Sequence, residues 1–233
     1  MQKMRLAALA ALGAWLGIAA PATAGNYDGD TLVRVQGTVV IPDSSAKVDI
    51  GGLPIPGASA DVSTEVIPTL TITHFFTKNV AAELFCCFGR FNVEGRGTAI
   101  NGANLGDFWV FPPILTLQYH FDPLRGFKPY IGAGVQYMAF FDEGHSNLPG
   151  SPKIDLDPAW GFALQGGVDV ELGQGWYLNA DIKKVWLDTD ANWGTLAKAN
   201  VTVDPLIISL GVGYRFNLSD LFGRRAEATP PLK

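Results

Sequence analysis

The chain has 233 residues, of which 48% are hydrophobic, 17% charged and 11% aromatic, and its formal net charge is −5. The charged fraction lies below the roughly 25% of an ordinary soluble domain, and the many aromatic and β-branched residues exclude an intrinsically disordered chain. A net negative charge without a clustered basic face excludes a nucleic-acid partner, and two adjacent cysteines, Cys86 and Cys87, can build neither a disulfide framework nor a zinc site with spaced ligand pairs.

The first 24 residues have the features of a secretory signal peptide. Lys3 and Arg5 give a basic start, an apolar Ala/Leu run follows, and Ala-Thr-Ala at residues 22–24 supplies an A-x-A cleavage site. The apolar run is shorter than the ~20 residues that a spanning helix needs, which disfavours an uncleaved membrane anchor. We therefore expect residues 1–24 to be removed from the mature protein.

Eight later segments alternate apolar residues with small or polar ones, and this period of two is typical of β-strands. The longest alternation runs from Trp160 to Leu172, a length that suits the 9 to 11 residues with which a tilted strand crosses a bilayer. In chain order the segments lie at residues 33–41, 69–73, 80–84, 115–122, 131–141, 160–172, 176–183 and 206–216.

The connections between these segments alternate between short and long. Short links rich in turn-forming residues lie at 77–79, 122–126 and 173–175. Long links rich in Gly, Pro, Asn and Asp lie at about 42–64, 89–110, 142–158 and 190–204. An even strand number with short turns on one rim and long loops on the other predicts an all-β fold, an eight-stranded antiparallel transmembrane β-barrel in the cell outer membrane.

A soluble eight-stranded barrel of lipocalin type would alternate in the same way, but with its apolar face inside. The interior of an eight-stranded barrel is narrow, so the small and polar residues fit there better than the bulky apolar ones. Aromatic residues also gather at the strand ends, as in the interfacial girdles of membrane barrels. These residues are Phe76, Phe121, Phe141, Trp160, Trp176, Trp186, Tyr214 and Phe216.

Four motifs extend this interpretation. They are Phe111-Pro-Pro-Ile-Leu-Thr-Leu-Gln-Tyr119; Phe127-Lys-Pro-Tyr-Ile-Gly-Ala-Gly-Val-Gln-Tyr137 followed by Phe140-Phe-Asp142; Trp160-Gly161 with Gly167-Val-Asp169; and Val203-Asp-Pro205 leading to Gly213-Tyr-Arg-Phe216. In these motifs the chain resembles the OmpW family of outer-membrane proteins, which includes the AlkL-type importers of hydrocarbons. The resemblance implies a narrow lumen, a hydrophobic pocket near the extracellular end, and small apolar molecules that leave sideways through a gap in the barrel wall.

The C-terminal end departs from the family pattern. The family usually finishes at an aromatic residue of the eighth strand, which serves as the assembly signal, whereas this chain continues. We expect residues 25–216 to form the barrel, residues 217–233 to be a periplasmic tail, and Tyr214 and Phe216 to carry the signal that the barrel assembly machinery reads.

Two groups of residues are expected to line the lumen. Charged residues near the short-turn rim are expected to form internal ion pairs that close the periplasmic end, although an ion-selective path is the alternative. This charge network consists of Arg34, Glu83, Asp169, Glu171, Asp181, Lys183 and Arg215. A hydrophobic pocket would use Ile50, Leu53 and Ile55 from the first long loop with Met138 and Phe140, unless that loop merely caps the barrel.

The sequence thus predicts a channel through which small hydrophobic molecules cross the outer membrane. A structural or surface-interaction barrel without transport and a narrow ion-conducting pore are the alternatives. The three histidines lie in no nucleophile motif, so we expect no enzyme activity, no catalytic residues, and neither cofactor nor metal. The expected partners are outer-membrane lipids, the barrel assembly machinery and small apolar solutes.

Overall fold

The computed structural model of the chain describes residues 29–50, 53–54, 57, 59–97, 101–147, 150, 153–194 and 197–217. Among these residues no helix is long and apolar enough to cross a membrane. The predicted signal peptide and the tail beyond Asn217 lie outside the described residues. The strands are β1 (Asp30–Ile41), β2 (Ser44–Ile50), β3 (Leu53–Pro54), β4 (Ser59–Val62), β5 (Glu65–Phe75), β6 (Val80–Cys87), β7 (Gly89–Arg96), β8 (Asn104–Phe111), β9 (Ile114–His120), β10 (Phe127–Phe141), β11 (Asp155–Leu156), β12 (Ala159–Gly173), β13 (Trp176–Trp193), β14 (Ala197–Val203) and β15 (Leu206–Asn217).

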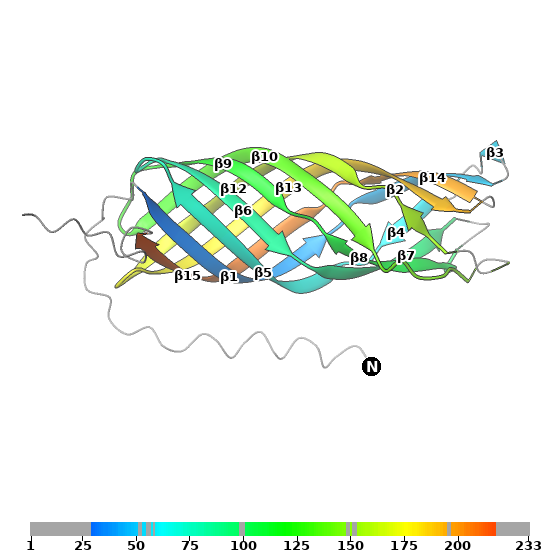
Figure 1. Ribbon diagram of the computed structural model, residues 1–233, viewed down its shortest axis with the longest axis horizontal. Coiled ribbons are helices and arrows are strands. Elements are labelled where there is room, and N and C mark those ends of the chain that lie inside the picture. Colours follow the sequence, from blue (N-terminus) through cyan, green and yellow to red (C-terminus); the bar gives the residue numbers. More distant parts are fainter. Residues whose placement is uncertain are drawn as a thin grey trace, which may run out of the picture.

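Eight of these strands close into an antiparallel barrel (Figure 1). Their order around the barrel is β1, β5, β6, β9, β10, β12, β13 and β15. The barrel closes where β15 pairs with β1, from Asp30 opposite Asn217 to Ile41 opposite Leu206. Closure leaves no unpaired sheet edge, a condition that a membrane-spanning sheet must meet because lipid offers no hydrogen bonds. The predicted eight-stranded barrel is confirmed, and each predicted segment contributes to one of its strands.

The short turns, the start of β1 and the end of β15 lie at one rim of the barrel, on the left in Figure 1. The turn between β12 and β13 shows why short links suffice there. Gly173, Gln174 and Gly175 have φ values of 100°, 53° and 84°, and glycine adopts positive φ without steric cost. In outer-membrane barrels the short turns lie on the periplasmic side, and we orient the molecule accordingly.

Beyond the other rim, the segments expected to be long loops are largely strands, which corrects that expectation. One extension sheet joins β2, β14 and the outer half of β13, with β3 and β11 at its edges. The other joins β4, β7, β8 and the end of β10. These segments are rich in glycine and polar residues, yet their residues still alternate, and pairing with extended neighbours keeps them in strands.

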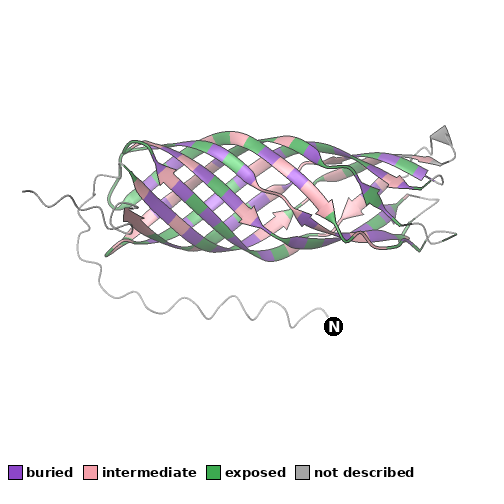
Figure 2. Cartoon of the chain, viewed as in Figure 1, coloured by how far each residue is buried: buried purple, intermediate pink, exposed green. Residues whose placement is uncertain are grey.

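Strand β13 shows how one strand serves two surroundings. Even-numbered residues face outward along its whole length and odd-numbered residues face the lumen. Towards the periplasmic rim the outward residues include Leu178 and Ile182, whereas beyond Trp186 they are Asp188 and Asp190. The outward residues therefore change from apolar to charged while the alternation of outward and inward residues continues, because the strand passes from lipid into water. Figure 2 shows the alternation of buried and exposed residues on both parts of the wall.

The outward aromatic residues lie near both limits of the apolar band. Near the short-turn rim Trp176 contacts Tyr214, with ring centroids 5.1 Å apart. At the far limit Phe162 stacks on Trp186 at 5.9 Å. Such belts are characteristic of the two membrane interfaces.

Candidate functional site

Arg34 is the centre of a polar cluster that fills the lumen in the periplasmic half of the barrel. Its guanidinium donates to both carboxylate oxygens of Asp169, at 3.0 and 2.6 Å, and to Oε2 of Glu83 at 3.0 Å. The Arg34 side chain is fully buried. A buried guanidinium is tolerated when acceptors surround it in this way, since an unpaired charge would be costly.

Lys183 and Gln165 extend the cluster to a third carboxylate. Lys183 donates to Asp181 and, at 3.2 Å, to Glu83. The amide nitrogen of Gln165 bridges the same two carboxylates, at 2.8 Å from Glu83 and 2.7 Å from Asp181. The Tyr130 hydroxyl donates to Asp181 at 2.9 Å.

Neutral side chains complete this cluster, which we call the lumen plug. Asn179 donates to Asp169 at 2.9 Å and to the Tyr130 hydroxyl at 3.0 Å, and Gln36 donates to Asn179 at 2.7 Å. The plug residues come from strands on opposite sides of the barrel. They are Arg34, Gln36, Thr73, Glu83, Thr116, Tyr130, Gln165, Asp169, Asn179, Asp181 and Lys183.

Five of the seven charges proposed from the sequence meet in the plug, and two lie nearer the periplasmic rim. Arg215 contacts Asp30 at 3.4 Å and lies over the Tyr177 ring. Glu171 is half-buried two residues before the β12–β13 turn. None of the neutral plug residues was among the site residues predicted from the sequence, although their inward position follows from the same alternation.

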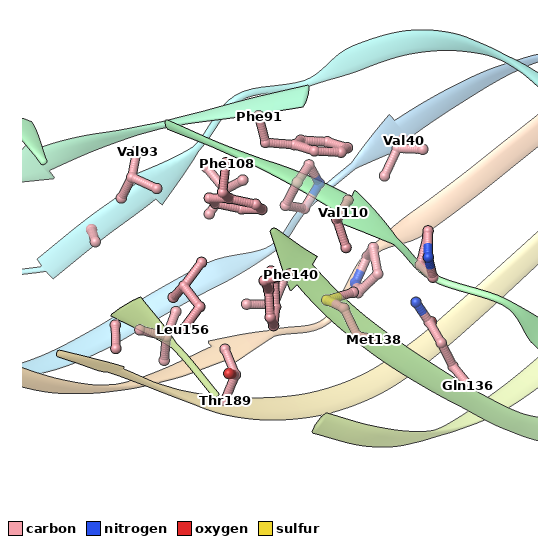
Figure 3. A pocket seen from close by; sticks show the side chains of 18 of the residues that line it. Val40, Phe91, Val93, Phe108, Val110, Gln136, Met138, Phe140, Leu156 and Thr189 are labelled. Carbon is pink, nitrogen blue, oxygen red and sulfur yellow. The ribbon is translucent and has the colours of Figure 1, made fainter. Parts of the chain in front are cut away.

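Above the plug the lumen becomes apolar and forms a cavity (Figure 3). The cavity has a volume of about 60 Å³. Among the described residues its polar side chains are Gln136 and Thr189. The others are Val40, Pro42, Ala60, Val62, Ile67, Phe85, Cys87, Phe91, Val93, Phe108, Val110, Pro112, Met138, Phe140, Ile154, Leu156, Ala191, Trp193, Val201, Val203, Pro205 and Ile207.

Aromatic rings from the extension sheets shape the outer part of this cavity. Phe91 and Phe108 stack with centroids 6.1 Å apart, and Phe140 meets Phe108 edge to face at 5.3 Å. The Trp193 indole N–H donates to the Leu105 carbonyl at 2.8 Å, so this ring adds apolar surface without an unpaired donor.

The pocket residues expected from the sequence fall into two groups. Met138 and Phe140 line the cavity. Ile50 and Leu53 pair within the β2–β3 hairpin at the outer tip, but their side chains, and all of Ile55, lie outside what the structure describes. The residues that do line the outer cavity were missed, although an alternation such as Phe91 and Val93 between polar neighbours could have indicated them.

The barrel wall is interrupted beside the cavity. Phe85 pairs with Ile114, and Gly89 pairs with Val110 in the same register. Between these pairs, residues 86–88 do not pair with residues 111–113, and we call this interruption the wall break. The Tyr137 amide donates to the Pro113 carbonyl at 3.0 Å, on the side of β10. Successive residues of a strand direct their backbone groups to opposite sides, so Pro112 faces the other way and has no N–H to offer Cys87.

Aromatic side chains cover this break on the outside. Phe88 stacks on Phe111 at 4.9 Å and contacts Phe141 edge-on at 6.3 Å. Cys87 and Pro112 line the cavity on the inner side, so the two unpaired strand segments with these side chains separate the cavity from lipid there. Both Cys86 and Cys87 are free thiols.

Comparison with known proteins identifies the family. The sequence profile of the OmpW family matches residues 27–216. The chain is 37% identical to the outer-membrane protein y4mB of Sinorhizobium fredii over 203 residues, 84% of this chain and 85% of that protein. It is 38% identical to the dibenzothiophene metabolism operon protein PahQ of Pseudomonas aeruginosa over 190 residues, 78% and 87% of the two chains.

A solved structure agrees with this relationship. The crystal structure of the outer membrane protein OprG from Pseudomonas aeruginosa matches with a TM-score of 0.76 and 29% identity, covering 83% of this chain and 99% of OprG. The fold, the matched residues and the outer-membrane relatives agree: the chain belongs to the OmpW family and is an outer-membrane β-barrel.

Proposed function

We propose that this barrel passes small hydrophobic molecules from the cell exterior into the outer membrane. The observation that carries the proposal is the division of the lumen into an apolar cavity above and a plug of ion-paired and hydrogen-bonded side chains below. A solute in the cavity has no water-filled path towards the periplasm, since side chains fill an eight-stranded barrel of this kind.

The wall break provides the sideways exit that an apolar solute would need. No ladder pairing joins residues 86–88 to residues 111–113, so the two segments can separate without breaking a ladder between them, and the contacts of Phe88 with Phe111 and Phe141 cover the gap. An apolar molecule gains free energy on passing from the cavity into lipid without crossing the charged plug, which would have to lose its ion pairs.

The name of one relative is consistent with this proposal. PahQ is named as a protein of a dibenzothiophene metabolism operon, and dibenzothiophene is an apolar aromatic compound. We extend only the chemical class, small hydrophobic molecules, to this chain.

The proposal is tested by placing a charge inside the cavity and the same charge outside it. Val93 points into the cavity and its neighbour Asn92 points into the exterior water. Val93→Arg should slow uptake of naphthalene by cells that produce the protein, because a cation in an apolar cavity is unfavourable. Asn92→Arg should leave uptake unchanged, and a folded, heat-modifiable band on gels should confirm assembly of both variants.

The comparison with hydrophilic solutes decides between the functions. Cells producing the wild-type barrel should take up naphthalene faster than control cells and should take up glucose at the control rate. Faster glucose uptake, or equal naphthalene uptake by the two variants, would contradict the proposal.

A further inference from the structure

Gln136 brings an unpaired polar group to the apolar cavity. The residue is 1% exposed, and its Oε1 is buried without a hydrogen-bond partner among the described residues. Thr189, the other polar side chain of the lining, donates to the Asp157 carbonyl at 2.7 Å. The cavity therefore has one buried side-chain oxygen in its described lining that no described residue satisfies.

The neighbours of Gln136 explain why its oxygen stays unpaired. On β10 it lies across from Ile114 of β9 and Gly161 of β12, and neither has a side chain that can donate. In Figure 3 Gln136 lies beside Met138, at the inner end of the labelled group. A ligand entering from outside would reach it last.

Of the other buried glutamines, Gln165 and Gln118 have partners for both ends of the amide, whereas Gln36 in the plug also has an Oε1 without a partner among the described residues. Gln165 uses its amide nitrogen on Glu83 and Asp181, and its oxygen accepts from Thr116 at 2.8 Å and Gln118 at 3.0 Å. A buried polar group without a partner costs stability, which an apolar side chain of similar size would not. Gln136, unlike Gln36, lines the cavity, so a ligand in the cavity can offset this cost.

We infer that the cavity binds molecules that are apolar over most of their surface and carry one hydrogen-bonding group, such as a hydroxyl or a ring N–H, which Gln136 receives. This inference rests on the proposed function and narrows its substrate class. Ligand pockets are commonly apolar with a few placed polar groups that fix orientation. A carboxamide both accepts and donates, so a hydroxyl suits it in either orientation of the amide.

The bound molecule would be oriented by this one contact. Its polar group would point inward to Gln136, and its apolar part would contact Met138, Phe140 and Phe108. To leave through the wall break, the bound molecule would then have to lose one hydrogen bond and would not have to break any contact with a charged residue.

The test compares two probes that share a ring system, 1-naphthol and naphthalene. Their binding is measured with the full-length barrel in lipid vesicles, and protein-free vesicles correct for partitioning into lipid. Gln136→Leu should weaken 1-naphthol binding about fivefold, the effect of one net hydrogen bond, and should leave naphthalene binding unchanged. Met138→Leu changes the same cavity at a neighbouring inward position and should leave the ratio of the two affinities as in the wild type.

The outcomes separate this inference from the proposed function. If Gln136→Leu leaves the affinity ratio unchanged, or weakens both probes equally, the polar role of Gln136 is overturned while the uptake function stands. If the wild-type barrel binds neither probe, the proposed function fails and the inference with it. Folding does not confound the test, because removing an unpaired polar group should leave the barrel at least as resistant to heat as the wild type.

Discussion

Arg34 and Asp169 face each other across the lumen, and two hydrogen bonds of 3.0 and 2.6 Å join the guanidinium to both carboxylate oxygens. Their strands, β1 and β12, are not neighbours in the barrel sheet. The pair thus ties opposite walls together, and the same bonds that hold the walls also close the lumen. Both side chains are shielded from solvent, so neither has water to replace a lost partner.

We expect Arg34→Met to destabilise the barrel by about 3 kcal/mol, because it leaves Asp169 and Glu83 buried beside one cation fewer. Urea unfolding of the protein in detergent micelles measures this change. Arg90→Met is the matched control, since Arg90 pairs with Asp107 at 2.5 Å on the exposed face of an extension sheet. An exposed pair contributes less than about 1 kcal/mol, and equal effects of the two substitutions would contradict a structural role for the plug.

The plug also predicts low ion conductance. In planar bilayers the wild-type barrel should show no sustained current in potassium chloride, because hydrogen-bonded side chains fill the lumen. Glu83→Ala combined with Lys183→Ala removes one charge of each sign from the centre of the plug and should open a measurable current. A large, steady current through the wild type would instead favour the ion-conducting pore.

The barrel could be predicted from the sequence because its alternation places bulky apolar residues outward over eight segments. The extension sheets were missed because their alternation has the opposite chemistry, with polar residues outward and apolar residues inward. In residues 89–96 the outward residues are Arg90, Asn92 and Glu94, and the inward ones include Phe91 and Val93. Such a segment resembles a polar loop until the cavity that it encloses is known.

For the candidate site, the sequence predicts which residues face the lumen but not which of them meet. Alternation places Asp169 and Glu171 on the same inward face of β12, but it does not say which of them meets Arg34. That depends on the stagger of strands across the lumen, which only the closed barrel defines. Residues far apart in the chain, such as Phe91 and Trp193, line the same cavity, and local patterns carry no information on which distant residues meet there.

Assembly should depend on the end of β15 and not on the residues that follow it. Tyr214 faces outward and stacks on Phe216 at 6.5 Å, and Asn217, which the sequence analysis placed in the tail, belongs to the strand and donates to Asp30 at 3.0 Å. Deleting residues 218–233 should leave the yield of heat-modifiable barrel in outer-membrane fractions unchanged. Tyr214→Ala with Phe216→Ala should reduce it severalfold, and the reverse result would place the assembly signal in the tail.

The wall break should control the release of solute. Pro112→Val restores an N–H opposite Cys87 and allows the β6–β7 and β8–β9 walls to pair across residues 86–88 and 111–113. A continuous ladder has to break hydrogen bonds before it opens, so naphthalene uptake should fall severalfold while the heat stability of the barrel rises. Pro68→Val is the control, because Pro68 lies opposite Gly37 within the unbroken β1–β5 ladder, and uptake should not change. If Pro112→Val stabilises the barrel but naphthalene enters at the wild-type rate, solute does not leave through this part of the wall, and the sideways exit is wrong.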